Sequence, residues 1–474
     1  MPPMIRSALF AYPAGSPWRG FSQSIRRASF AALLPLALAL STVVPASAAP
    51  VDVDVQLGQS VLPVGKAGKV YLRLSVKGGT AKRGEKRTPV NVALVLDRSG
   101  SMKGDRMASA KEAAAMALQR LAAEDVVALV AYNHGVDVLQ KAERLGGDHV
   151  LKQKIDKLEA DGRTALHAGV VAGGEEVKRH LAANSVNRVI LLSDGLANVG
   201  PSTPRELGEL GRELGAKGIS VTTIGLGLDY NEDLMQRLAA ASDGNHAFVE
   251  KASDLNAIFN AEFGDALSVT AQDIEIIIEC RIGFKPLRVL GREAAIEGNR
   301  IRMKLNQLQG ANERYVVVEL EQPEVRTPGD AEIASVTVDY LDLDSGSRAR
   351  SEAKAKGRFS SSEKDAEESV NKSVMSQVTT QIATETSEKA VELRDKGDIS
   401  GAKKLLEGNA AYLKDRRNFY GLGASPAAPS ALGALEQLEK KQNDAANNLD
   451  ADNWGKARKA MRSEQHKSKV QQSY

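Results

Sequence analysis

Three oxygen-bearing side chains directly follow a short apolar run. Residues 92–96 read Val-Ala-Leu-Val-Leu, and Asp97, Ser99 and Ser101 come immediately after them. All three side chains offer oxygen, and none offers nitrogen or sulfur. Because hard oxygen donors suit Mg²⁺, Ca²⁺ or Mn²⁺ rather than zinc or copper, the spacing indicates a divalent cation site at the end of a strand.

Two further positions strengthen this interpretation. Thr164 ends the segment 161–164, just before a helical pattern, and Asp194 follows the apolar run at 189–192. Open α/β sheets bind ligands at the carboxyl ends of their strands, so we expect all five side chains to meet at one edge. The alternative is that they only cap helices and loops, as Ser and Asp often do.

The segment 89–266 contains the elements that must position these residues. Its short, continuous apolar runs are typical of strands buried on both faces: 92–96, 126–130, 189–192 and 221–224. Helical patterns lie between them, at 105–122, 165–182 and 204–217. Alternating strands and helices predict a doubly wound, mostly parallel, Rossmann-like α/β domain.

The flanks of this domain alternate apolar and polar residues. Period two is typical of half-exposed strands, and it appears on both sides of the domain. The first stretch is too small for a core of its own, so we predict that the α/β domain is inserted in one β-sandwich. Cys280 is expected to be a buried residue of a strand.

The whole chain is predicted to have six parts. They are 1–48, a signal peptide; 49–88, strands pairing with the later β region; 89–266, the α/β domain; 268–350, the β-sandwich region; 351–368, a polar linker; and 369–474, a helical region. Within the last part, residues 390–406 resemble one helical repeat of tetratricopeptide type, or else form a plain hairpin or docking tail. Residues 420–433 are predicted to be a flexible joint.

The order Asp-x-Ser-x-Ser, then Thr, then Asp resembles a von Willebrand factor type A domain with a metal-ion-dependent adhesion site. The resemblance covers about residues 89–266, and it implies that five residues hold the metal: Asp97, Ser99, Ser101, Thr164 and Asp194. The flanks resemble those of secreted bacterial members of this superfamily and of the inter-alpha-trypsin inhibitor heavy chains.

The ligand set and the resemblance together suggest how such a site works. Two carboxylates, at least one of which can act through water, incompletely quench a divalent cation, and neutral hydroxyls supply the other ligands. One coordination position should therefore stay open. Mg²⁺ is the expected ion, and Ca²⁺ or Mn²⁺ are the alternatives. The family fills the open position with an Asp or Glu of a protein partner. The family also implies that the last helix, here about 253–263, moves with the metal. We therefore expect Phe259→Ala or Phe263→Ala to alter partner affinity.

The composition of the chain limits the classes of function and of covalent structure that it can have. The chain has 474 residues, 63 Lys plus Arg against 60 Asp plus Glu, and one Cys. Near-neutral charge gives no argument for nucleic-acid binding, and a single cysteine excludes an internal disulfide. Residues 1–28 carry arginines and no acid, and an apolar run and an Ala-Ser-Ala site at 46–48 follow. This is the layout of a secretory signal peptide; a membrane anchor and a twin-arginine signal are the alternatives.

We therefore expect an exported protein, periplasmic or extracellular, with no transmembrane segment after cleavage. The leading function is non-enzymatic binding of a protein partner through the metal. The alternatives are an envelope scaffold that docks through its helical tail and a metal-dependent hydrolase, although Ser99 lacks a G-x-S-x-G context. The six histidines are expected at the surface, and the basic C-terminal residues on a solvated helix face.

Overall fold

The computed structural model describes residues 50–79, 87–146, 148–281, 283–421 and 429–472. The predicted signal peptide, 1–48, lies outside these residues, as does the central part of the predicted joint, 422–428. Across the described ranges, no helix combines the length and apolar character needed to cross a membrane.

A six-stranded sheet forms the centre of the α/β domain. Its strands are Val90–Asp97 (β4), Val126–Tyr132 (β5), Val136–Arg144 (β6), Val186–Ser193 (β7), Ile219–Leu226 (β8) and His246–Val249 (β9). They are ordered β6-β5-β4-β7-β8-β9, and all neighbours are parallel except β5 and β6. The predicted doubly wound fold is confirmed, and β6 and β9 are additions at its edges.

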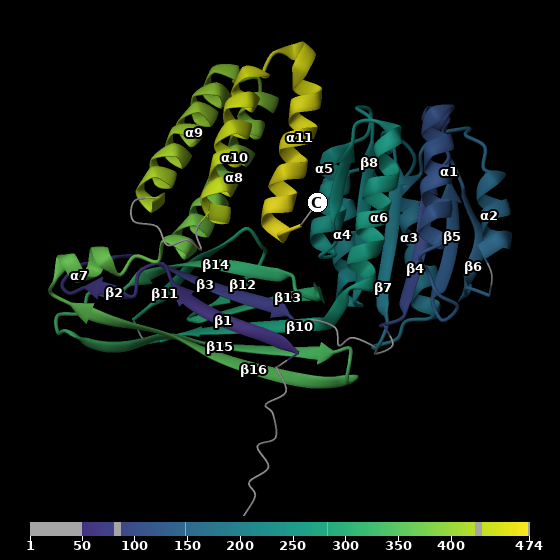
Figure 1. The fold of residues 1–474 in the computed structure, drawn as a ribbon. Coiled ribbons are helices and arrows are strands. Elements are labelled where there is room, and N and C mark those ends of the chain that lie inside the picture. The colour runs from purple at the N-terminus through teal and green to yellow at the C-terminus, as the bar shows by residue number, and fades with distance from the viewer. Residues whose placement is uncertain (1–49, 80–86, 147, 282, 422–428, 473–474) are drawn as a thin grey trace, which may run out of the picture. The chain divides into compact units, whose positions relative to one another are not determined.

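Helices cover both faces of this sheet (Figure 1). One face packs against α1 (Asp105–Leu118), α2 (Asp148–Asp156) and α6 (Leu255–Leu267), and the other against α3 (Leu166–Arg179), α4 (Pro204–Ala216) and α5 (Glu232–Ala241). In β4, Leu94 and Leu96 face the first set, whereas Ala93 and Val95 face the second. The apolar run at 92–96 is continuous because both faces of the strand are buried.

Two further sheets form a sandwich around a second core. The first contains β1 (Val51–Leu57), β3 (Gly68–Gly78), β14 (Glu313–Gln322) and β11 (Lys285–Leu290), in that order. The second contains β12 (Ala295–Glu297), β13 (Arg300–Gln309), β10 (Val269–Cys280), β15 (Gly329–Asp342), β16 (Ser347–Ser360) and β2 (Val61–Pro63), also in order. Strands from both sides of the α/β domain share these sheets, so the predicted insertion is confirmed. Cys280 is buried in β10, as expected.

The prediction of a linker at 351–368 is wrong. This segment contains most of β16 and the short helix α7 (Glu363–Glu368). β16 pairs with β15 along its whole length, but among its side chains only Ala355 and Phe359 are buried. Because the exposed residues of β16 are all polar or charged and the half-buried ones are small Ala, Ser or Gly residues, the strand has the composition of a linker.

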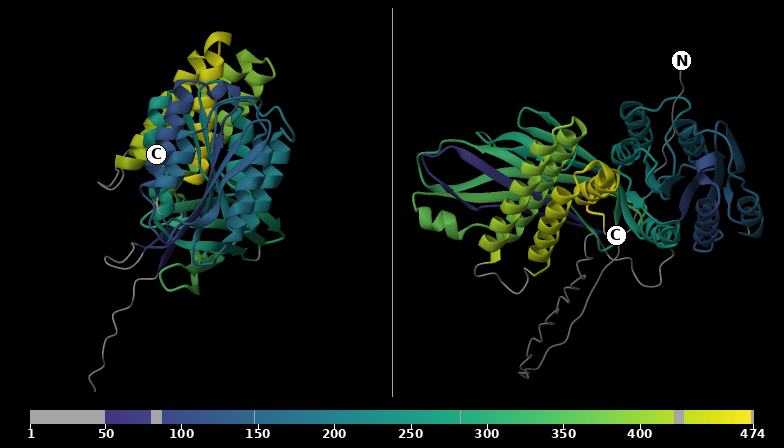
Figure 2. Two further views of the ribbon diagram at one scale, coloured as in Figure 1. Left: turned by 90° about the vertical axis from the view of Figure 1, so that its right-hand side faces the viewer. Right: turned by 90° about the horizontal axis from the view of Figure 1, so that it is seen from above.

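Four helices complete the described chain: α8 (Lys372–Asp395), α9 (Ile399–Gly421), α10 (Pro429–Asn447) and α11 (Ala451–Val470). Val374 and Val378 of α8 pack against Leu290 and Val317 of the first sandwich sheet. α11 lies against α5 and β9 of the α/β domain. Figure 2 shows these helices, green to yellow, from two further sides. The tail is therefore packed on both other layers instead of extending freely.

Two predictions about polar residues are corrected where α11 meets the α/β domain. His246 and His466 are buried, and their rings lie 6.0 Å apart. Each ring has a hydrogen-bond partner, Thr223 Oγ1 at 2.9 Å from His246 Nδ1 and a backbone carbonyl at 3.1 Å from His466 Nε2. Lys459 is also buried rather than solvated. Isolated sequence positions gave no sign of this contact between segments more than 200 residues apart.

Candidate metal site

The site lies where the strand order of the α/β sheet reverses direction. β4 is flanked by β5 and β7, and the chain connects outward from it to both sides. Such a switch point leaves a crevice at the carboxyl ends of the strands. Asp97 is the last residue of β4, and Asp194 directly follows β7. Both carboxylates are therefore placed at the crevice, and both residues are fully buried.

Hydrogen bonds fix the Asp97 carboxylate. Its Oδ1 accepts from the Ser99 backbone N–H at 2.8 Å, and its Oδ2 accepts from Ser193 Oγ at 2.6 Å and from the Tyr132 hydroxyl at 3.4 Å. Burial raises the pKa of Asp97 to about 6, and the hydrogen bonds from Ser193 and Ser99 oppose this rise. A bound cation would favour the ionised form, because it supplies the missing positive charge.

Backbone contacts bring the loop of Thr164 to the loop of Asp97, although the two are far apart in sequence. The Gly100 N–H donates to the Gly162 carbonyl at 3.0 Å, and the Asp161 N–H donates to the Arg98 carbonyl at 2.8 Å. The Thr164 N–H in turn donates to Asn198 Oδ1 at 2.9 Å, which joins it to the loop after β7. The three loops therefore form one connected rim.

Gly195 marks the point on which the hydroxyl groups converge. A Cβ atom added to it would lie 3.0 Å from Ser101 Oγ, 3.3 Å from Thr164 Oγ1 and 3.8 Å from Ser99 Oγ. Ser101 Oγ also lies 3.1 Å from Ser99 Oγ and donates to Asp194 Oδ1 at 2.7 Å. The structure thus brings the five predicted site residues to one small space lined by oxygen.

Helix capping does not explain this arrangement. Ser99 begins the 3₁₀ turn Gly100–Met102 but makes no side-chain cap hydrogen bond to it. The N-caps of α1 and α3 are Gly104 and Ala165, so neither helix is capped by one of the five residues. The hydroxyls remain directed toward one another, as a group of oxygen ligands requires.

The donor set fits a hard divalent cation. Two carboxylates supply two negative charges, and three hydroxyls supply neutral oxygen, the ligands that Mg²⁺ and Ca²⁺ accept. Over the residues that the structure describes, no cluster of three or more His, Cys, Asp and Glu side chains is arranged to hold a metal. The candidate site differs from such clusters, because it combines two carboxylates with three hydroxyls.

A positively charged side chain beside the site, that of Arg106, was not among the residues predicted from the sequence. Arg106, from the first turn of α1, places Nη1 2.7 Å from Asp194 Oδ2 and Nη2 3.1 Å from Asp229 Oδ2. The hydrogen bond to Asp194 raises the pKa of Arg106, so its charge is permanent. The sequence indicated Arg106 only through its position shortly after Ser101, in the first turn of the helix that follows the rim.

Comparison with known proteins identifies the α/β domain. Residues 91–261 match the family model of the von Willebrand factor type A domain. An uncharacterised protein of Synechocystis is 26% identical over 307 residues, covering 62% of this chain and 72% of that protein. Porcine (Sus scrofa) inter-alpha-trypsin inhibitor heavy chain H2 is 30% identical over 166 residues, covering 33% of this chain and 18% of that one. The Escherichia coli protein YfbK, also uncharacterised, is 26% identical, and the match covers 47% of this chain and 39% of YfbK.

Solved structures show the same fold over most of the chain. A von Willebrand factor type A protein from Catenulispora acidiphila has a TM-score of 0.63 at 16% identity, covering 77% of this chain and 87% of its own. The ArnB paralog VWA2 from Sulfolobus acidocaldarius has a TM-score of 0.59 at 16% identity, covering 89% and 98%. Residues 91–261 therefore form a von Willebrand factor type A domain, a module that commonly mediates protein–protein interaction, set within a β-sandwich and followed by helices.

Proposed function

We propose that this chain is a non-enzymatic binding protein that holds an acidic residue of a protein partner through a divalent cation. Mg²⁺ is the expected ion, with Ca²⁺ or Mn²⁺ as alternatives, and its ligands are Asp97, Ser99, Ser101, Thr164 and Asp194. The observation that carries the proposal is the convergence of three hydroxyls around Gly195, beside two buried carboxylates.

The charge at the site favours an anionic partner. The carboxylates of Asp97 and Asp194 and the three neutral hydroxyls would leave a bound divalent cation electrophilic, with one coordination position open. The ligand that fills the open position should therefore carry negative charge, and a carboxylate is the common anionic side chain of proteins. A charge-assisted contact of this kind can anchor an otherwise modest interface.

The surroundings of the rim support a protein partner. Leu196 is 57% exposed two residues after Asp194, and Leu228 is 47% exposed next to Asp229. Arg106 contacts both aspartates, so it ties together the two loops that carry these leucines. A partner segment with an acidic residue next to an apolar one could bind the cation with its carboxylate and cover the two leucines with its apolar side chain.

We also propose that the protein is exported, to the periplasm or the extracellular space, because residues 1–48 have the layout of a signal peptide. The alternative of a scaffold that docks through its tail has less support. α8 and α11 already use their faces against the sandwich and the von Willebrand factor type A domain.

Capture from the envelope fraction of the parent cell tests the proposal. Immobilised protein is compared in Mg²⁺ and in EDTA, as wild type and as the Ser101→Ala and Asp97→Ala variants. Asp105→Ala is the matched control, because Asp105 is an exposed carboxylate at the start of α1, close in sequence to Ser101. We expect wild type and Asp105→Ala to capture the same partners in Mg²⁺ and to lose them in EDTA. Ser101→Ala and Asp97→Ala should not capture these partners in either condition. Capture that persists in EDTA and in Asp97→Ala would contradict the proposal.

A further inference from the structure

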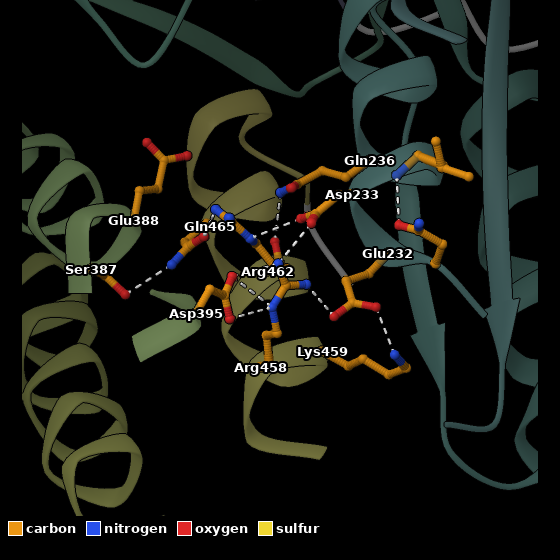
Figure 3. A network of polar contacts seen from close by, with 12 residues as sticks. Glu232, Asp233, Gln236, Ser387, Glu388, Asp395, Arg458, Lys459, Arg462 and Gln465 are labelled. Carbon is orange, nitrogen blue, oxygen red and sulfur yellow. Dashed lines mark hydrogen bonds and ion pairs between the residues drawn. The ribbon is translucent and has the colours of Figure 1, made fainter. Parts of the chain in front are cut away.

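The start of α5 and one face of α11 share a dense group of charges (Figure 3). Lys459 Nζ lies 2.6 Å from Glu232 Oε2, and both side chains are only 7% exposed. Arg458 contacts Glu232 as well, and it also reaches Asp233 and Asp395, each at 2.7 Å. Three separate segments, in α5, α8 and α11, therefore meet through one arginine and one lysine.

Additional contacts fasten the same face of α11. Arg462 Nε lies 3.2 Å from Asp233 Oδ1, and the Arg462 carbonyl accepts from Gln236 Nε2 at 2.7 Å. The Lys459 ammonium also lies 4.9 Å from the centre of the Tyr230 ring. α11 thus holds the first turn of α5 together with the end of the loop that precedes it.

That loop, residues 227–231, is the one that Arg106 joins to the metal site. Arg106 contacts Asp229 at 3.1 Å and Asp194 at 2.7 Å. A Cβ atom on Gly227 would lie 3.1 Å from Arg106 Nη2, so the guanidinium is also close to the loop backbone. A continuous series of contacts therefore runs from a predicted metal ligand to the C-terminal helix.

We propose that α11 is an intramolecular clamp whose docking on α5 lowers the affinity of the site for its divalent cation. The inference rests on the proposed metal site. A cation bound beside Asp194 would repel the Arg106 guanidinium and compete with it for that carboxylate, so metal binding is favoured when Arg106 withdraws from Asp194. α11 holds the 227–231 loop, and with it Asp229, in the position that keeps Arg106 at Asp194.

Thermodynamic linkage makes the effect reciprocal. If docking of α11 weakens metal binding, metal binding must weaken docking of α11 by the same factor. Partner engagement at the rim would then loosen the helical tail. The plain alternative is that α11 only covers β9, the edge strand of the sheet, without influence on the metal site.

Calorimetric titration of Mg²⁺ into the full-length, EDTA-treated protein separates these possibilities. Lys459→Met removes the contacts of Lys459 with Glu232 and with the Tyr230 ring. We expect this variant to bind Mg²⁺ at least about fivefold more tightly than wild type, which is the lower end of typical coupling. Lys469→Met is the matched control on the same helix, because Lys469 pairs with Glu388 of α8 instead of with the α/β domain. It should bind Mg²⁺ as wild type does.

A double-mutant cycle tests the route through Arg106. Arg106→Met alone should raise Mg²⁺ affinity, and in that background Lys459→Met should add nothing. If Lys459→Met does not fold, the double variant Glu232→Gln with Lys459→Met replaces it, because it removes both charges of the buried pair together. Hydrogen exchange gives a second readout: Mg²⁺ should increase amide exchange in α11.

Each outcome is decisive. Equal Mg²⁺ affinities in wild type and Lys459→Met, with unchanged exchange in α11, would overturn the clamp and leave the metal site standing. A gain in affinity that persists in the Arg106→Met background would overturn the proposed route. If wild type binds no Mg²⁺, Ca²⁺ or Mn²⁺, the metal site fails and the clamp fails with it.

Discussion

Gly195→Ala provides a sharp perturbation of the site. The added methyl group would lie 3.0 Å from Ser101 Oγ and 3.3 Å from Thr164 Oγ1, in the space on which the hydroxyls converge. An ion cannot share that space with carbon, and the hydroxyls would have to move apart. Disturbing the support of metal ligands typically costs 10–100-fold in affinity, so direct obstruction should cost about 100-fold or more, or about 2.7 kcal/mol.

The same change should leave the fold intact. Gly195 does not have a positive φ, so alanine is compatible with its backbone. Replacing such a glycine commonly stabilises by about 0.4–1 kcal/mol, and the close contact with Ser101 would offset part of this gain. We therefore expect the metal-free free energy of unfolding to change by no more than about 1 kcal/mol.

Calorimetry with Mg²⁺ and urea unfolding without metal measure the two quantities. Gly408→Ala is the matched control, because a Cβ atom there would meet nothing within 4 Å. Loss of Mg²⁺ binding in Gly195→Ala but not in Gly408→Ala is the expected result. Full Mg²⁺ affinity in a folded Gly195→Ala protein would refute the placement of the ion.

Three further predictions concern other parts of the molecule. Burial lowers the pKa of His246 to about 3 and that of His466 well below its usual value. Below pH ~6.5 the unfolded state therefore binds more protons than the folded state. The free energy of unfolding should decrease as the pH is lowered, by up to about 1.4 kcal/mol per pH unit for each histidine. Burial raises the pKa of Asp97 to about 6 and that of Glu262 to about 7, and both shifts oppose this trend. The test therefore compares the pH dependence of the free energy of urea unfolding in wild type and in His466→Gln. A His466→Gln protein with the wild-type pH dependence would contradict the assignment. Phe259 and Phe263 are on the buried face of α6, and we expect Phe259→Ala or Phe263→Ala to change partner capture while Mg²⁺ binding persists. Unchanged capture in both variants would exclude coupling between α6 and the partner site. Leu196→Ser and Leu228→Ser should weaken capture without changing Mg²⁺ affinity, since both side chains are exposed outside the ligand set; equal capture by both variants would place the interface elsewhere.

The parts of the fold that could be predicted are those encoded by local patterns. The buried strands β4, β5, β7 and β8 have continuous apolar runs, because each is covered on both faces. The five oxygen-bearing residues were predictable because they follow such strands or precede a helix in a specific order. Three of them place their hydroxyls around Gly195, and the other two are buried carboxylates at the ends of β4 and β7, in agreement with that expectation.

What could not be predicted depends on partners distant in sequence. β16 has the composition of a linker because only two of its residues are buried and all of its exposed residues are polar or charged. Lys459 and His466 look like ordinary polar residues of a basic helix until α11 is placed against α5 and β9. Arg106 is unremarkable in its own helix, and its role depends on Asp194 and Asp229, 88 and 123 residues away.

The proposed function requires one ion held by side chains from three loops, and Thr164→Val removes a ligand of that ion. Valine keeps the shape of threonine and removes the one hydroxyl that the third loop contributes, at a buried position beside Gly195. Calorimetry should show one Mg²⁺ per wild-type chain and at least about tenfold weaker binding by Thr164→Val, at unchanged metal-free stability. Equal Mg²⁺ affinity in the two proteins, or no binding of a divalent cation by wild type, would contradict the central claim.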